Sequence, residues 1–182
     1  FKISDGIKNS SKNRVDLFHY SQITRKEKPF VQGFYILHEG LIGVIDENLK
    51  EETYDKIKDK NQKYQGSKGW VGITDKYWLT AIVPQQKQAF NAEFTFNNSY
   101  KANYILTTPS SVNPGQTTSS SAQLFIGAKE VEVIDGYAKT AEINKFDLAI
   151  DWGWFYFFTK PLFFIIDYFF KWCGNFGVAI II

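Results

Sequence analysis

GWVGITDKYWLTAIVPQ, residues 69–85, contains the clearest pair of strands in this chain. Trp70–Ile73 and Tyr77–Val83 are each rich in β-branched and aromatic residues, which favour extended backbone. A polar triplet, TDK, separates them, so the pattern predicts a β-hairpin. We expect Pro84 to end the second strand, because proline has no N–H to donate to a neighbouring strand.

Short apolar runs on both sides of this hairpin predict further strands. Phe30–Leu37 and Leu41–Ile45 predict a second hairpin across the sequence HEG. Phe90–Phe96 alternates apolar and polar residues, as a strand with one buried face does. Tyr100–Thr107 repeats this pattern, and Val15–Tyr20 predicts a short strand nearer the N-terminus.

The other segments before residue 146 complete a mainly β fold. Residues 46–64 are charged and predict either a solvated strand pair with a loop or a short surface helix. Residues 108–121 are rich in Pro, Ser, Thr, Asn and Gly, which predicts a loop, and Gln123–Gly127 predicts a short strand. Lys129–Ile143 has apolar residues at helical spacing. Many strands followed by a helix favour a β-sandwich over alternating βαβ units.

Composition narrows the class of protein. The 182 residues are enough for one domain with a core. A formal charge of +2 argues against nucleic acid as a partner, because nucleic-acid proteins carry a basic patch or stripe. Cys173 is the single cysteine and the chain has two histidines, so we expect no internal disulfide, no zinc site and no cofactor. The chain starts without Met or an apolar leader, and we interpret it as a processed chain or a piece of a longer protein.

The C-terminal part is very different from the rest. FDLAIDWGWFYFFTKPLFFIIDYFFKWCGNFG covers residues 146–177, and from residue 152 to the end the only charges are Lys160, Asp167 and Lys171. These three side chains are seven and four residues apart and share a narrow stripe of a helix. We expect a helix that starts at Pro161 and stops before the sequence Gly-Asn at residue 174. That helix is too short to span a bilayer, which takes about 20 residues.

A short helix with a wide aromatic face and a charged stripe is typical of a membrane surface. Trp and Tyr favour the headgroup level, since one end of each is apolar and the other is wet, and lysine can extend its amine outward to water. The candidate membrane-interface residues are Trp152, Trp154, Tyr156, Lys160, Pro161, Tyr168, Lys171 and Trp172.

Two other interpretations of this segment stay open at this point. Residues 162–182 could form one transmembrane helix, although Asp167 and Lys171 would then cost about 2.5–3.5 kcal/mol each near the centre of the bilayer. The segment could also be a buried helix of a soluble domain. That interpretation leaves the apolar run Val178–Ile182 unexplained, whereas the start of a membrane span explains it.

Several stretches resemble one protein family in order along the chain. Residues 69–85 and FYILHEGLIGV at 34–44 resemble segments of the periplasmic domain of YidC-family membrane protein insertases. LFIGAKEVEVIDGYA at 124–138, FDLAIDWGWFYFFTKPLF at 146–163 and GNFGVAIII at 174–182 resemble the passage from that domain into the membrane. The resemblance covers the chain from about residue 14 to its end.

The resemblance implies a twisted β-supersandwich, similar to mutarotase and carbohydrate-binding domains, with helices at its C-terminal end. It implies a periplasmic domain over residues 1–146, with its helix near 129–143. It further implies a linker with an amphipathic interfacial helix over residues 147–173, and the start of a transmembrane helix over residues 174–182. The arginine of the family's membrane groove lies beyond Ile182, so no residue here matches it.

The resemblance also implies a function. Family members insert and fold inner-membrane proteins, alone or with the Sec translocon. The implied partners are nascent membrane proteins, the Sec translocon with its accessory subunits, and the lipid bilayer, but not nucleic acid. The implied location is the bacterial inner membrane, multi-pass in the full-length protein, with most of these residues on the periplasmic side.

Two other classes of function are an enzyme and a membrane-anchored binding module. An enzyme would have to use His19, His38 and Glu39, the only acid–base set that the sequence offers. Adjacent strand residues point to opposite faces, so His38 and Glu39 need not share a pocket, and we expect no catalysis. A membrane-anchored periplasmic β-sandwich binding module would share the same tail. The reading frame beyond Ile182 distinguishes it from an insertase.

Overall fold

The computed structural model describes residues 1–29, 37–153 and 155–181. The chain divides into two compact units, Phe1–Ile150 and Asp151–Ile182. Of the described residues, those in strands all belong to the first unit, and the second unit contains helices.

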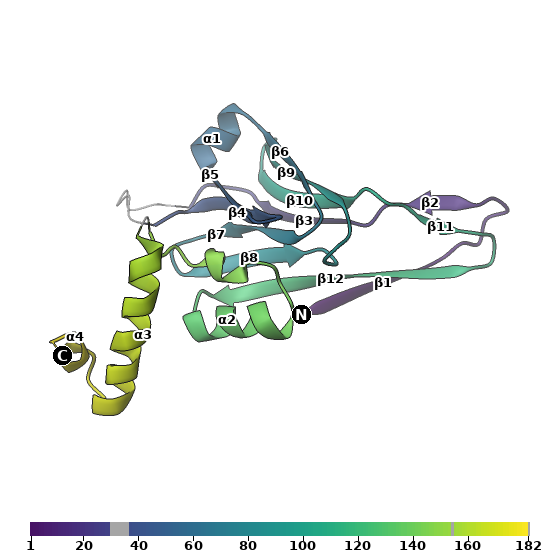
Figure 1. The fold of residues 1–182 in the computed structure, drawn as a ribbon. Coiled ribbons are helices and arrows are strands. Elements are labelled where there is room, and N and C mark those ends of the chain that lie inside the picture. The colour runs from purple at the N-terminus through teal and green to yellow at the C-terminus, as the bar shows by residue number, and fades with distance from the viewer. Residues whose placement is uncertain (30–36, 154, 182) are drawn as a thin grey trace. The chain divides into compact units, whose positions relative to one another are not determined.

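Two antiparallel sheets form the body of the first unit (Figure 1). The larger sheet has six strands, in the order β1 (Lys2–Lys8), β12 (Thr117–Ala128), β8 (Trp78–Val83), β7 (Gly69–Thr74), β4 (Gly40–Ile45) and β5 (Asn48–Thr53). The smaller sheet has four, in the order β3 (Tyr20–Arg25), β10 (Tyr100–Leu106), β9 (Phe90–Phe96) and β6 (Gln62–Gly66). A separate pair joins β2 (Val15–Leu17) to β11 (Ser110–Val112).

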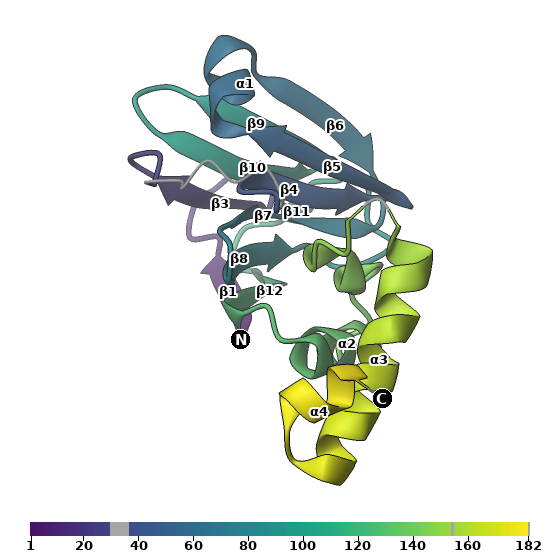
Figure 2. The same cartoon turned by 90° about the vertical axis from the view of Figure 1, so that its left-hand side faces the viewer.

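Three helical segments complete the first unit, namely α1 (Tyr54–Asp59), α2 (Val131–Thr140) and the short 3-10 helix η1 (Phe146–Ala149). Figure 2 looks along the sandwich and shows the two sheets as stacked layers, with α2 and η1 on the side of the larger sheet that faces away from the smaller one. The second unit contains α3 (Tyr156–Cys173) and α4 (Phe176–Ile181).

The larger sheet is covered on both faces, which explains the apolar runs of its central strands. One core lies between the two sheets and includes Leu41, Val71 and Phe94. A second core lies between the larger sheet and the helices α2 and η1, and includes Trp70 and Phe146. Every residue of β4 and of β7 is therefore buried. A strand buried on both faces has a continuous apolar sequence instead of an alternating one.

The sandwich and most of its elements confirm the predictions. The hairpin of residues 69–85 is present as β7 and β8, and β9 and β10 match the predicted strands closely. The predicted late helix is present as α2 and packs through Ile134. Residues 46–64 contain β5, α1 and β6, so the short helix exists. The strand pair is wrong, because β5 pairs with β4 in the larger sheet and β6 pairs with β9 in the smaller one. Residues 30–36 of the predicted strand Phe30–Leu37 lie outside the described residues.

The predicted loop at residues 108–121 is wrong in part. Residues 110–112 form β11, and β12 starts at Thr117, well before the predicted Gln123. The strand β1 was also missed, and Val15–Tyr20 is divided between β2 and β3. The physical reason is long-range pairing, because Lys2 lies opposite Gln123 and Lys8 opposite Thr117 along the whole of β1. Ser and Thr form a strand there without an alternating apolar pattern.

Candidate membrane-interface site

The helix α3 is longer than the sequence predicted. It starts at Tyr156, so Pro161 lies inside it, and the prediction that Pro161 starts the helix is wrong. Proline in a helix removes one backbone hydrogen bond. The first turn is formed before it, since the N–H groups of Phe158 and Thr159 both donate to the carbonyl of Phe155 at 2.8 and 2.9 Å.

Side chains around Trp152 hold the start of α3. The Thr159 hydroxyl donates to the Trp152 carbonyl at 2.8 Å. The indole ring packs edge to face against Phe163, with ring centroids 5.6 Å apart. The Lys160 ammonium lies 5.8 Å from the centroid of the same indole ring, which is within the range of a cation–π interaction. These contacts replace a side-chain cap, which Phe155 does not provide.

The charged side chains of α3 follow one stripe along its axis. The Lys171 ammonium and the Asp167 carboxylate form an ion pair at 2.8 Å, in the i, i+4 geometry that a helix favours. Lys160 is seven residues before Asp167, which places it on the same side of the helix two turns earlier. The stripe is narrow, because the other residues of α3 are apolar or aromatic apart from Thr159, with a hydroxyl on Tyr156 and Tyr168.

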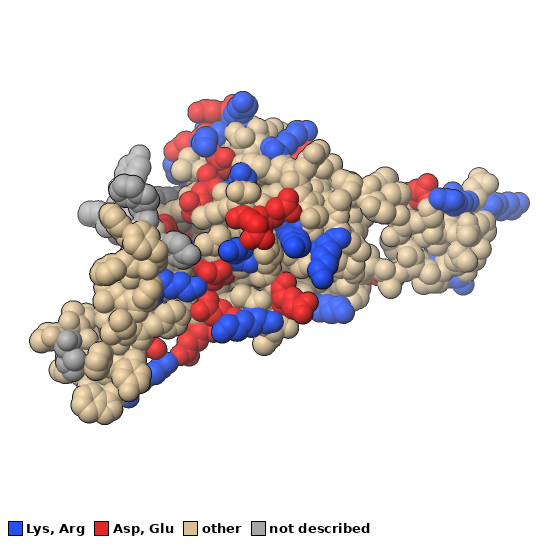
Figure 3. Space-filling view, viewed as in Figure 1, with Lys and Arg blue, Asp and Glu red and all other residues tan. Residues whose placement is uncertain are grey.

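The rest of α3 and α4 exposes large apolar side chains. Trp172 is 77% exposed and Tyr168 is 70% exposed. Figure 3 shows that the visible surface of these helices is almost free of charge, whereas acidic and basic side chains are interspersed over the first unit. The other exposed members of this surface are Phe157, Phe158, Leu162, Phe163, Phe164, Ile165, Phe170, Phe176, Val178, Ile180 and Ile181. A contiguous apolar surface of this kind marks a site of contact with a membrane or a protein.

The end of α3 confirms the predicted stop. Gly174 has a left-handed backbone, with φ of 67°, and its N–H donates to the Phe170 carbonyl at 2.8 Å. The side chain of Asn175 then accepts from the N–H of Gly177 at 2.9 Å and caps α4. Among the helices of residues 1–29, 37–153 and 155–181, none combines the length and the apolar character that crossing a bilayer requires.

The structure places the predicted interface residues at both ends of α3. Trp152 and Lys160 contact each other at its start. Tyr168, Lys171 and Trp172 lie in its last two turns. Tyr156 is the first residue of the helix, Pro161 lies within it, and Trp154 lies outside the described residues.

Prediction from the sequence missed Phe157 and Phe158 as part of this surface, because it started the helix at Pro161. Both are exposed in the first turn of α3. The available signal was the aromatic run before the proline, which continues the helical spacing of the residues after it.

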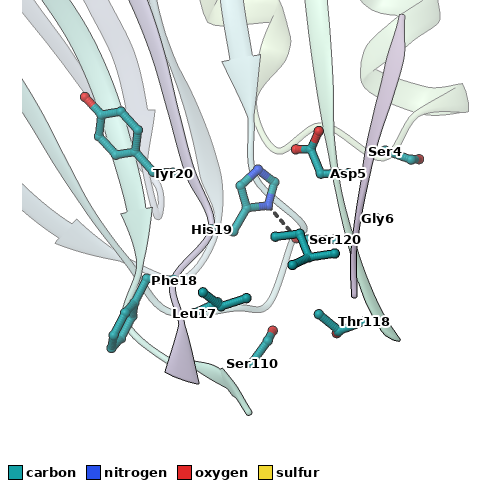
Figure 4. Close-up of a pocket in the computed structure, with 11 residues that line it drawn as sticks. Ser4, Asp5, Gly6, Leu17, Phe18, His19, Tyr20, Ser110, Thr118 and Ser120 are labelled. Carbon is teal, nitrogen blue, oxygen red and sulfur yellow. Dashed lines mark hydrogen bonds between the residues drawn. The ribbon is translucent and has the colours of Figure 1, made fainter. Parts of the chain in front are cut away.

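The acid–base set considered for an enzyme is not assembled. His19 lines a hollow of about 490 Å³ and is hydrogen-bonded through Nδ1 to Ser120 (Figure 4). Among the described residues that line this hollow, neither His38 nor Glu39 is present. The imidazole of His38 instead lies 3.1 Å from the Leu41 carbonyl. In the part of the chain that the structure describes, no group of three or more His, Cys, Asp or Glu could hold a metal ion.

Comparison with known proteins gives one consistent result. The family model of the YidC periplasmic domain matches residues 1–165. Proteins named membrane protein insertase YidC match the whole chain, from Pelagibacter ubique at 48% identity, Mesorhizobium japonicum at 45% and Rickettsia bellii at 42%. The chain spans 32%, 31% and 34% of these relatives, or about a third of their length. The family model covers the whole sandwich and most of the chain, so the chain belongs to the YidC periplasmic domain family.

Proposed function

We propose that this chain is the periplasmic and membrane-interface part of a membrane protein insertase in the bacterial inner membrane. The observation that carries the proposal is the exposed aromatic surface of α3 with its single charged stripe. Support comes from the relatives, which are named membrane protein insertase and are about three times as long as this chain. In this proposal the membrane core belongs to the part of the protein outside this chain.

The helix α3 lies along the membrane surface in this proposal, with its charged stripe toward water. Apolar side chains cover most of its circumference, so it enters the boundary between headgroups and acyl chains. Asp167 and Lys171 partner each other at 2.8 Å, which lowers the cost of holding two charges near lipid. Tyr168 and Trp172 match the headgroup level, because each carries a polar atom on an apolar ring. The helix α4 then starts a membrane span after Gly174.

Insertion needs no covalent chemistry. Polar groups of a nascent membrane protein are costly in hydrocarbon, and an insertase lowers that cost by offering a polar route. In this proposal the first unit lies in the periplasm, and α3 sets the height and orientation of the membrane core that follows it. The nascent membrane protein is the substrate, and the Sec translocon with its accessory subunits is the partner of the full-length protein.

The depth of α3 tests the proposed placement. In the full-length protein in vesicles, a spin label at Asp167→Cys should lie at headgroup depth, and one at Ile165→Cys should lie deeper. Asp167 belongs to the charged stripe and Ile165 to the exposed apolar surface, so the two labels report opposite sides of the helix. A label from Asp167→Cys at the middle of the bilayer would contradict a surface helix.

The function is tested by insertion activity. The full-length variant carrying Trp152→Ser, Tyr168→Ser and Trp172→Ser should insert a reporter membrane protein several-fold more slowly than the wild type. The reason is that it loses the ring contacts at the start of α3 and the exposed rings at its end. Tyr77→Ser is the control, because Tyr77 is an exposed aromatic residue of the first unit, outside α3. Unchanged insertion by the triple variant would show that α3 has no part in the activity.

A further inference from the structure

The junction between α3 and α4 is a packed turn. Figure 1 and Figure 2 both show α4 beside the last turns of α3, and the two helices contact each other. The rings of Phe170 and Phe176 meet edge to face, with centroids 6.0 Å apart. Ala179 is 3% exposed, although the residues on either side of it are exposed. We call this junction the α3–α4 elbow, and its members are Phe170, Cys173, Gly174, Asn175, Phe176 and Ala179.

Asn175 accepts the hydrogen bonds that start α4. Its Oδ1 accepts from the Gly177 N–H at 2.9 Å and from the Val178 N–H at 3.3 Å. Its backbone carbonyl accepts from the Ala179 N–H at 3.0 Å and from the Cys173 thiol at 3.3 Å. The first four N–H groups of a helix have no partner within that helix. The side chain of Asn175 therefore satisfies two of these four groups in α4.

The glycines beside Asn175 make this arrangement possible. Gly174 has a left-handed backbone, which favours glycine because it has no Cβ, and this residue turns the chain out of α3. A Cβ placed on Gly177 would lie 3.3 Å from the Oδ1 of Asn175. Glycine at that position leaves the acceptor uncrowded, so the sequence Gly-Asn-Phe-Gly at 174–177 matches the geometry of the cap.

The sequence around the elbow offers no second acceptor. From Trp172 to Ile182, Asn175 has the only side-chain oxygen, and the residues of α4 are all apolar. In the proposed function α4 begins a membrane span, so its first turn lies where water becomes scarce. An N–H group without a partner is costly in hydrocarbon, whereas in water the solvent replaces a lost cap.

We infer that Asn175 is a positioning residue for insertion. By satisfying the first N–H groups of α4, it fixes the depth at which the surface helix ends and the membrane span begins. The inference rests on the proposed function, because it takes α3 as a surface helix and α4 as the start of a span. Asn175 acts through the placement of α4 and not through contact with the nascent membrane protein.

Insertion by the full-length protein tests this role. Asn175→Ala should insert a reporter membrane protein about fivefold more slowly than the wild type, at equal amounts of protein in the membrane, because it loses the cap. Asn175→Ser should stay within about twofold of the wild type, because serine is also a favoured cap. Thr53→Ala is the matched control and should insert at the wild-type rate, since it uncaps α1, a helix of the same length in the first unit.

The depth of a spin label separates positioning from a general loss of stability. In vesicles, with Cys173 replaced by serine to keep a donor, a label at Ile180→Cys reports the depth of α4. Adding Asn175→Ala should move this label toward the headgroups by about 5 Å, or one helical turn, because uncapped N–H groups are drawn to water. Adding Asn175→Ser should leave its depth unchanged.

Several results would overturn the inference. These are wild-type insertion by Asn175→Ala, an equal loss in Asn175→Ser or in Thr53→Ala, and an Ile180 label that keeps its depth in Asn175→Ala. In each of these cases a label at Asp167→Cys can still lie at headgroup depth, which leaves the surface helix intact. A label at Asp167→Cys in the middle of the bilayer would instead contradict the proposed function itself, so the two proposals fail separately.

Discussion

Asp46 connects the β4–β5 turn to the link between β6 and β7 through one carboxylate. It lies between β4 and β5 with a left-handed backbone, at φ of 54°. Its Oδ1 accepts from the Ser67 N–H at 2.9 Å, from the Ser67 hydroxyl at 3.2 Å and from the Lys68 N–H at 3.2 Å. The hydrogen bond from the Ser67 backbone is the main reason that the pKa of Asp46 is lowered in the folded protein. A charged acceptor with several donors stabilises a turn more than a neutral one does.

We predict that Asp46→Asn lowers the free energy of unfolding at pH 7 by about 1 kcal/mol, because it keeps an acceptor but loses the charge. Asparagine also tolerates the left-handed backbone. A carboxylate with a lowered folded-state pKa contributes stability above its unfolded pKa of about 3.9, and this contribution is lost as the pH falls through the folded-state pKa. Urea unfolding of wild type and variant should therefore differ at pH 7 and converge in acid.

The neighbouring residue provides the control for this prediction. Glu47 is exposed and forms only a loose ion pair with Lys145, at 3.7 Å. Glu47→Gln should change the free energy of unfolding by less than about 0.5 kcal/mol at either pH. A difference between wild type and Asp46→Asn that stays the same from pH 7 to pH 3 would contradict the assigned role of the charge.

At the scale of elements, α1 shows how tertiary contacts stabilise a helix that is too short to form alone. It has six residues, and isolated helices of this length are unstable in water. Thr53 caps it by accepting from the Lys56 N–H at 3.3 Å. Tyr54 is buried, and its hydroxyl accepts from Arg25 at 2.8 Å. Burial raises the pKa of Tyr54 to about 12, so the phenol keeps its proton at neutral pH.

We predict that Ile57→Ala destabilises the first unit by about 2–5 kcal/mol, because it leaves a cavity where α1 closes the core between the sheets. Lys58→Ala is the control on the exposed side of the same helix and should change stability by less than about 0.5 kcal/mol. Urea denaturation of both variants measures the difference. A loss below 1 kcal/mol for Ile57→Ala would show that α1 is not part of the cooperative core.

At the scale of the whole molecule, the larger sheet is the centre of the first unit. Its strands β4 and β7 are buried on both faces, by the smaller sheet and by α2 with η1. The smaller sheet is less protected, since residues of β6 and β3 alternate between half-buried and exposed. Stability within a protein follows such differences in burial, and the best-buried elements open only on global unfolding.

We predict that the amide hydrogens of β4 and β7 exchange more slowly than those of any other described element. The amides of β3 and β6 should exchange faster, because those strands form the edges of the smaller sheet. Hydrogen–deuterium exchange of the full-length protein, followed by mass spectrometry of peptides, provides the measurement. Slower exchange in β6 than in β7 would mean that the larger sheet is not the most stable part of the first unit.

Local patterns in the sequence were sufficient to predict a strand or a helix wherever a residue's neighbours along the chain determine its secondary structure. The apolar runs of residues 69–85 and the alternation of Phe90–Phe96 predicted their strands, and the aromatic tail predicted a helix with one charged stripe and an end at Gly174. Pairing between distant segments had to come from the fold. The Ser- and Thr-rich start of β12 is a strand because β1 lies beside it, and no local pattern contains that partner. The start of α3 also depends on contacts that are not visible in the local pattern. Local preference would start the helix at Pro161, but contacts around Trp152 hold an earlier turn, so Pro161 lies inside the helix.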